Sequence, residues 1–218
     1  MRHFEDTGHH KKLRRKLVTI LQEKGIKDWR VLEAIAAIPR HYFMPSHLED
    51  KAYEDRPFPI GEEQTISQPY TVAYQTQLLD LKTTDRVLEI GTGSAYQAVI
   101  LASIAYEVFS IERQKKLYER NLHFRYLRAF DNLYFFYGDG FEGLPEFAPF
   151  DKILITAAAP YIPEKLTAQL KWNGKMVLPL GKEKPQKMTV ITKQENDELT
   201  EESFNMFSFV PMLKGKKD

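Results

Sequence analysis

The chain has 218 residues, 31 Lys and Arg against 30 Asp and Glu, 43% hydrophobic residues and no cysteine. This length favours one domain with a core that is stable without covalent cross-links. The net charge of +1 gives no electrostatic argument for a nucleic-acid scaffold or a membrane-surface binder. The lack of cysteine excludes disulfides, cysteine-ligated zinc and thiol nucleophiles. The sequence has no run of 18 or more apolar residues that could span a membrane and no signal-peptide pattern, so a cytoplasmic protein is expected.

Two amphipathic helices are predicted first, at residues 11–24 and 28–38, after a tail at residues 1–10. Residues 11–16 are mostly basic and fit the solvated face of a helix, with a nucleic-acid contact as the less favoured alternative. Residues 39–69 hold five prolines and few periodic apolar positions. A segment of this length is usually functional or disordered, and its aromatic residues indicate that it is ordered and contributes to a site.

After residue 70 the pattern alternates between short apolar strands and amphipathic helices. Helices are predicted at residues 71–80, 95–105, 114–129 and 162–171. Strands are predicted at residues 86–90, 107–111, 133–137, 151–156, 175–180, 188–193 and 203–210. This alternation indicates an α/β fold with a doubly wound, mostly parallel, Rossmann-like sheet. The last two strands follow each other without a helix, so they are expected to form an antiparallel hairpin at the sheet edge.

We interpret residues 1–218 as one domain with three parts. Residues 11–80 form an N-terminal helical and substrate-loop segment, residues 81–181 form the cofactor-binding core, and residues 182–218 form the C-terminal strands. The core pattern begins only near residue 86, and the residues before it are too many to be a simple lead-in. We therefore expect the N-terminal part to select the substrate.

A glycine-rich turn lies between the predicted strand at 86–90 and the helix that follows. It reads Glu89-Ile90-Gly91-Thr92-Gly93-Ser94-Ala95. Glycines at such a turn let the backbone approach a ligand closely at a helix N-terminus. Glu112 ends the next strand, where an acidic side chain accepts both ribose hydroxyls of an adenosine. An ordinary tight turn with a surface glutamate is the alternative.

The spacing of the turn discriminates between adenosine cofactors. Tyr96 stands at the sixth position, where the NAD fingerprint needs Gly or Ala, so NAD is the minor alternative. The G-x-G-x-A spacing after Glu89 resembles motif I of S-adenosylmethionine-dependent methyltransferases. This resemblance implies that Glu89 lies near the cationic methionyl ammonium. It also implies that Asp139, followed by Gly140, binds the adenine amino group.

Longer blocks resemble one family more specifically. Residues 60–69, Ile-Gly-Glu-Glu-Gln-Thr-Ile-Ser-Gln-Pro, look like the signature loop of the protein-L-isoaspartate (D-aspartate) O-methyltransferase family. Further similar blocks extend the resemblance over about residues 28–212. The chain departs from the family at Glu63 and Ala95, where glycine or another small residue is usual. A negative φ at Ala95 is expected to make its methyl group tolerable.

The resemblance implies methyl transfer from S-adenosyl-L-methionine to the free carboxylate of L-isoaspartyl residues in damaged proteins. The methyl ester then closes to a succinimide, which begins repair. Isoaspartyl proteins and peptides are the expected partners of a monomer, without nucleic acid or membrane. The alternatives are a methyltransferase of the same fold for a small molecule or nucleic acid, and a cofactor-binding module without turnover. The absence of cysteine excludes cytosine C5 methylation.

The resemblance also assigns site residues. Ser67 is expected to orient the acceptor carboxylate, and a helix N-cap or turn serine is the alternative. The cofactor is expected to contact Gln64, Thr65, Ile66, Ser67, Glu89, Gly91, Gly93, Glu112, Asp139 and Gly140. An extended peptide is expected along Ala158, Pro160, Val210 and Pro211, with plain loop packing as an equal alternative. The six histidines lack metal-ligand spacing, so structural roles and no metal are expected.

Overall fold

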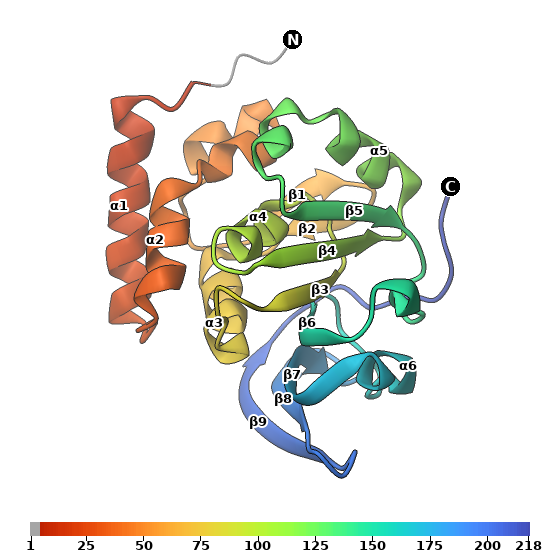
Figure 1. Ribbon diagram of the computed structural model, residues 1–218. Helices are drawn as coiled ribbons and strands as arrows, with labels where there is room; N and C mark the ends of the chain where they lie inside the picture. The colour runs from red at the N-terminus through yellow and green to blue at the C-terminus, as the bar shows by residue number, and fades with distance from the viewer. Residues whose placement is uncertain (1–4) are drawn as a thin grey trace.

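The computed structural model describes residues 5–218, which are built around a seven-stranded sheet (Figure 1). Its strands are β3 (Arg86–Ile90), β4 (Glu107–Glu112), β5 (Leu133–Tyr137), β6 (Phe150–Ile155), β7 (Leu170–Leu180), β8 (Gln186–Lys193) and β9 (Leu199–Phe207). Their order is β5-β4-β3-β6-β7-β8-β9. The strands from β5 to β7 are parallel, whereas β8 is antiparallel to both β7 and β9. The expected doubly wound sheet with an antiparallel edge is confirmed.

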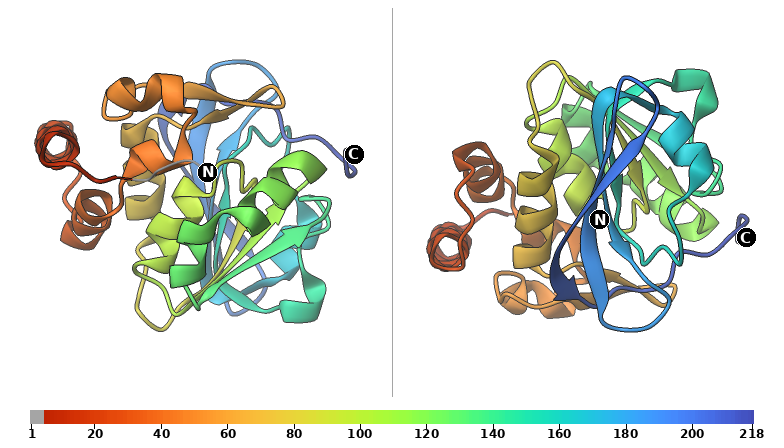
Figure 2. Two further views of the ribbon diagram at one scale, coloured as in Figure 1. Left: turned by 90° about the horizontal axis from the view of Figure 1, so that it is seen from above. Right: turned by 90° about the horizontal axis from the view of Figure 1, so that it is seen from below.

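Helices cover the two faces of the sheet to unequal depth. They are α1 (Gly8–Glu23), α2 (Trp29–Ala37), α3 (Pro69–Leu79), α4 (Tyr96–Ala102), α5 (Lys115–His123) and α6 (Glu164–Ala168). Figure 2 shows α1 and α2 as an outer layer on the side of the sheet opposite α6. Val87 packs on the side of the sheet that carries α1 and α2, and Leu88 packs with Leu166 of α6 on the other side. Strand β3 is therefore apolar on both faces. Within residues 5–218, every helix is too short or too polar to cross a membrane.

The helix expected at residues 114–129 is interrupted near its middle. Phe124 has an extended backbone that ends α5, and a 3-10 helix, η3 (Arg125–Ala129), follows. The break sends the Phe124 ring against Phe43, with 5.4 Å between ring centres. Tertiary aromatic packing therefore overrides the helical periodicity at this point.

Two later boundaries also differ from the expected ones. The helix expected at 162–171 is confined to α6, because the Gln169 side-chain amide donates to the Lys165 carbonyl that a continued helix would use. The strand expected at 203–210 ends earlier as β9, and the Phe209 N–H donates to the Gln186 side chain instead. In both places a glutamine side chain replaces a regular backbone partner.

The start of the chain is helical sooner than expected. Within the predicted tail at residues 1–10, α1 already begins at Gly8, and the Thr7 hydroxyl caps it by accepting the N–H of His10. Residues 1–4 of that tail, with His3, lie outside the described residues. The hydrophobic positions of α1 pack against α2 rather than against the sheet.

Residues 39–69, called the proline-rich segment below, are ordered and hold short elements. These are the 3-10 helices η1 (Arg40–Phe43) and η2 (Ser46–Lys51) and the antiparallel strands β1 (Phe58–Gly61) and β2 (Gln64–Ile66). Phe58 and Ile66 are buried, and the Phe43 ring meets Tyr96 at 5.4 Å between ring centres. The segment therefore packs against the start of α4.

Candidate active site

A cavity opens where the chain reverses its direction across the sheet. From β3 the chain continues to β4 and β5 on one side and returns to β6 on the other, which creates a crevice at the carboxyl ends of the strands. The expected site residues that line this cavity are Gln64, Thr65, Ile66, Ser67, Gly91, Gly93, Glu112, Gly140, Val210 and Pro211. The expected residues outside its wall are Glu89, Asp139, Ala158 and Pro160.

Residues 91–95, called the glycine turn below, place both of their glycines in left-handed backbone conformations. The angle φ is +98° at Gly91 and +54° at Gly93. A Cβ atom on Gly91 would lie 2.5 Å from the Oγ1 atom of Thr156, so only glycine fits there. The Thr156 hydroxyl, at the end of β6, lies 2.8 Å from the Gly91 carbonyl oxygen and donates to it. The neighbouring strand thus supports the turn directly.

The expectation of a negative φ at Ala95 is wrong. Ala95 has φ of +68° and precedes α4 in the left-handed region, where a side chain costs about 1–2 kcal/mol. Glu62 and Glu63, at the tip of the β1–β2 hairpin, also have positive φ, of 51° and 57°. A two-residue hairpin of this kind favours glycine at its second position. Both departures from the small residues usual in the family therefore fall where glycine relieves strain.

Glu89 lies beneath the glycine turn. Its side chain is fully buried, Oε2 accepts from the Ser110 hydroxyl, and Oε1 has no partner among residues 5–218. Burial raises the pKa of Glu89 to about 8, although the Ser110 hydrogen bond opposes the shift. The carboxyl group is therefore mostly protonated at neutral pH in this structure. Its expected contact with a methionyl ammonium stays a prediction.

Glu112 joins the glycine turn to the end of β4. Its Oε2 atom accepts the N–H of Gly93 and its Oε1 atom accepts the N–H of Gln114, each at 2.8 Å. Burial raises the pKa of Glu112, and these backbone donors oppose that shift. The carboxyl group is held in the cavity wall with lone pairs left to accept further hydrogen bonds. Its expected contact with ribose hydroxyls stays a prediction.

Asp139 follows β5, and the C-terminal tail engages its carboxylate. Oδ1 accepts the N–H of Phe141 at 2.9 Å, and Oδ2 accepts the N–H of Gly215 at 2.7 Å. The Lys217 N–H donates to the carbonyl of Arg113 at 2.8 Å, just beyond β4. Figure 1 shows this tail passing the carboxyl ends of β4 and β5. An adenine amino group at Asp139 would therefore share the carboxylate with Gly215.

Ser67 connects β2 to α3 and is half-buried in the cavity wall. Its carbonyl oxygen accepts a hydrogen bond from Nη2 of Arg40 at 2.9 Å. The cap residue of α3 is Gln68, and no side-chain cap hydrogen bond is made. The helix-capping alternative for Ser67 is therefore wrong, because its side chain does not cap the start of α3.

The proposed peptide groove is partly filled by the chain itself. The Ala158 N–H donates to the Val210 carbonyl, and the Met212 N–H donates to the Ala158 carbonyl, each at 2.8 Å. Backbone pairing of a substrate with Ala158 would have to replace these two bonds. Val210 and Pro211 line the cavity from the same segment, whereas Pro160 lies outside its wall.

Gln97 is among the cavity residues that the sequence analysis did not assign to the site. Gln97 of α4 lines the cavity; its amide nitrogen donates to the Thr76 hydroxyl at 3.0 Å, and its buried Oε1 atom has no partner among residues 5–218. An unpaired buried acceptor is costly unless a ligand supplies a donor. The available signal was a glutamine inside the otherwise apolar helix sequence Tyr-Gln-Ala-Val-Ile-Leu-Ala.

The cavity suits an adenosine cofactor that carries a charged amino-acid end. The glycine turn allows close backbone approach, and Glu112 offers carboxylate oxygens for hydroxyl groups. The unpartnered Oε1 atom of Gln97 can accept from an ammonium group. The residues present therefore fit S-adenosylmethionine. This cofactor carries no phosphate, so it needs no cationic side chain to bind one.

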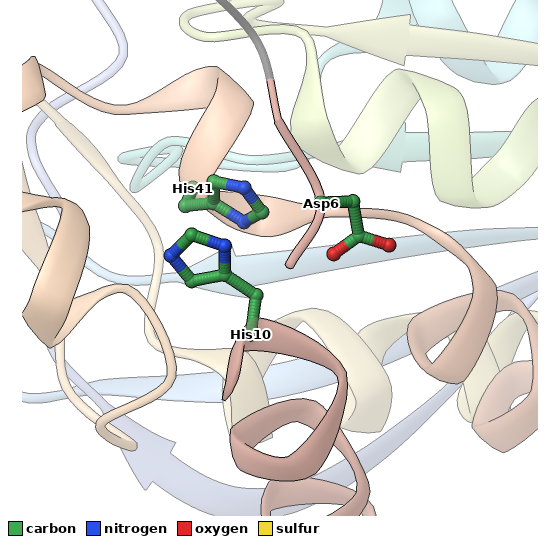
Figure 3. Close-up of side chains that lie close together, drawn as sticks. All are labelled: Asp6, His10 and His41. Carbon is green, nitrogen blue, oxygen red and sulfur yellow. The ribbon is translucent and has the colours of Figure 1, made fainter. Parts of the chain in front are cut away.

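A second polar cluster lies away from this cavity, between the start of α1 and η1. Ligand atoms of Asp6, His10 and His41 lie within 4.8 Å of one another (Figure 3). Arg14 binds the two carboxylate oxygens of Asp6 at 3.0 and 2.9 Å, and the two imidazole rings stack with 3.9 Å between their centres. A metal ion there would have to displace Arg14. The cluster therefore fits a structural contact that fastens α1.

Comparison with known sequences gives one consistent result. A family model described as protein-L-isoaspartate(D-aspartate) O-methyltransferase matches residues 11–217. The chain is 49% identical to the protein-L-isoaspartate O-methyltransferase of Flavobacterium psychrophilum, over 98% of this chain and 100% of that protein. It is 50% identical to the same-named protein of Cytophaga hutchinsonii, over 96% of this chain and 95% of that protein.

Solved structures agree with the sequence comparison. A protein-L-isoaspartate O-methyltransferase with 30% identity superposes with a TM-score of 0.82 over 91% of this chain, which spans only 65% of that structure's length. A structure from Plasmodium falciparum, described as belonging to the same enzyme type and in complex with S-adenosyl-L-homocysteine, gives a TM-score of 0.80 at 25% identity. The match covers 93% of this chain and 99% of that one.

Proposed function

This chain belongs to the protein-L-isoaspartate(D-aspartate) O-methyltransferase family, and from that membership we propose that it methylates the free carboxylate of L-isoaspartyl residues with S-adenosyl-L-methionine. The observation that carries the proposal is the shared cavity. Ser67 and residues 64–66 of the proline-rich segment line it together with Gly91 and Gly93. Acceptor and methyl donor are thereby brought to one place.

The chemistry needs no general base. A free α-carboxyl group has a pKa of about 3.5, so the acceptor is ionised at neutral pH. One carboxylate oxygen forms a bond to the methyl carbon while the sulfur–carbon bond breaks. The electron pair of the broken bond goes to sulfur. No proton moves in this step. The protein's contribution is orientation and exclusion of water, which supply roughly 7–11 kcal/mol in well-oriented reactions.

The side chains divide this work between donor and acceptor. The glycine turn and Glu112 hold the adenosyl group, and S-adenosyl-L-methionine supplies the activated methyl group when bound. Ser67 donates a hydrogen bond that orients the acceptor carboxylate. Val210 and Pro211, which line the same cavity, contact the peptide. The methyl ester then closes to a succinimide, which reopens in part to normal aspartate.

The enzyme acts on damaged proteins and peptides in the cytoplasm, as a monomer and without nucleic acid or membrane. Its net charge of +1 supports this setting, because a nearly neutral protein neither attracts nor repels substrates of a particular charge. Recognition then rests on the cavity rather than on long-range electrostatic steering.

The test compares an isoaspartyl peptide with its aspartyl twin, using a radiolabelled methyl donor. The expected product is a base-labile label on the isoaspartyl peptide alone, since the two peptides differ only in which carboxylate is free. Equal labelling of both peptides contradicts the selectivity. Absence of label with the donor still bound supports a binding module without turnover.

A further inference from the structure

Arg40 is a buried cation without a carboxylate partner. Its side chain is 0% exposed, and Nε donates to the Ala52 carbonyl while Nη2 donates to the Ser67 carbonyl, each at 2.9 Å. Nη1 is buried without a hydrogen-bond partner among residues 5–218. The guanidinium carbon also lies 4.9 Å from the centre of the Tyr96 ring. Arg40 therefore contacts only neutral groups directly.

The other buried arginine of this region is neutralised. Arg14 is 5% exposed and holds both oxygens of Asp6, so its charge is balanced in place. The carboxylate whose charge acts on Arg40 is that of Asp55, which is itself paired with Lys24 at 2.6 Å. Burial lowers the pKa of Arg40 to about 10, which still leaves it charged at neutral pH. A fixed positive charge thus lies behind Ser67.

The contacts of Arg40 connect the two halves of the site. Ala52 belongs to the proline-rich segment, Ser67 lines the cavity, and Tyr96 begins α4 directly after the glycine turn. Holding the Ser67 carbonyl fixes the peptide plane from which the Ser67 side chain projects. Because the Arg40 guanidinium also contacts the Tyr96 ring, it fixes the position of Ser67 relative to the glycine turn.

We propose that Arg40 is the positioning residue for the acceptor: it holds Ser67 in place and supplies a remote positive charge that favours an anionic acceptor over a neutral one. This inference rests on the proposed function. Methyl transfer joins a carboxylate to a positively charged methyl donor and cancels both charges. Direct pairing with a guanidinium would stabilise the carboxylate before reaction and weaken it as a nucleophile. A cation one residue away attracts the acceptor and leaves its oxygen free.

The test compares Arg40→Lys and Arg40→Met with the control Arg14→Lys, which alters another buried guanidinium that does not line the cavity. Three quantities are measured: kcat and KM for an isoaspartyl peptide, the Kd of S-adenosyl-L-homocysteine, and Tm. We expect kcat/KM to fall roughly 100-fold in Arg40→Met, with partial recovery in Arg40→Lys. The Kd is expected to change by less than about threefold. Arg14→Lys is expected to lower Tm without this kinetic change.

A second readout isolates the charge. The inhibition constant of the matching carboxamide peptide is divided by the KM of the isoaspartyl peptide. This ratio measures the preference for the carboxylate and is expected to shrink in Arg40→Met. If Arg40→Met does not fold, the same ratio is measured in Arg40→Lys, where the misplaced ammonium shrinks it less. Unchanged ratios and kinetics in an active background overturn the role of Arg40. A wild-type protein that leaves the isoaspartyl peptide unlabelled overturns the proposed function instead.

Discussion

The glycine turn and the proline-rich segment line one cavity, but different interactions hold them. The turn is held by backbone hydrogen bonds, since the N–H groups of Gly91 and Thr92 donate to the Ile111 carbonyl of the neighbouring strand, and the Thr156 and Glu112 side chains add to them. In the segment, side chains from other elements bind the backbone, as Arg120 does when it donates to the Ile60 carbonyl at 2.8 Å. Substitutions that add atoms to the glycines should therefore damage the turn. Substitutions that remove polar side chains should damage the segment.

The largest effect is expected from Gly91→Ala. Its methyl group would meet the Thr156 hydroxyl, and its φ is +98°, so backbone strain and overpacking add to about 2–5 kcal/mol of lost unfolding free energy. Gly25→Ala is the matched control, because φ is +94° there and no atom lies within 4 Å of the added carbon. Urea unfolding measures both variants. Equal losses in the two would show that the contact with Thr156 is unimportant.

A pH-dependent effect is expected from Glu89→Gln. Because the pKa of buried Glu89 is raised from 4.5 to about 8, the folded state holds a proton that the unfolded state releases. This stabilisation is fully present below pH 4.5 and is lost as the pH rises to about 8. Glutamine does not titrate, so the variant should gain in Tm relative to wild type from pH 5 to 8. Parallel curves of Tm against pH would contradict the buried, protonated carboxyl.

The smallest effects separate the two regions at their strained residues. Glu63→Gly is expected to stabilise the exposed hairpin by about 0.5–1 kcal/mol, because relief of about 1–2 kcal/mol of strain at its positive φ exceeds the entropic cost of glycine, about 0.5–1 kcal/mol. Ala95→Gly relieves similar strain but removes a fully buried methyl group worth about 0.8 kcal/mol, so its gain should be close to zero. Chemical denaturation measures both free energies. An equal gain at both positions would show that the Ala95 methyl group contributes no packing.

The sequence predicted the sheet and the glycine turn because apolar periodicity and glycine spacing are local features. It did not predict the sign of φ at Ala95, or the break at Phe124, which depends on packing against Phe43, a residue distant in the chain. Arg40 and Gln97 were missed for the same reason. A basic residue after a proline, or a glutamine in an apolar helix, gives no sign of what it will contact.

Ser67 belongs to the proline-rich segment but lies beside the glycine turn, so Ser67→Ala tests the division of work most directly. The measurement is kcat for an isoaspartyl peptide beside the Kd of S-adenosyl-L-homocysteine in the same preparation. The account predicts a roughly 100-fold fall in kcat, because the acceptor loses its orienting hydrogen bond. The Kd should stay within about threefold of the wild-type value. Methylation at the wild-type rate, or an equal loss of cofactor binding, would contradict it.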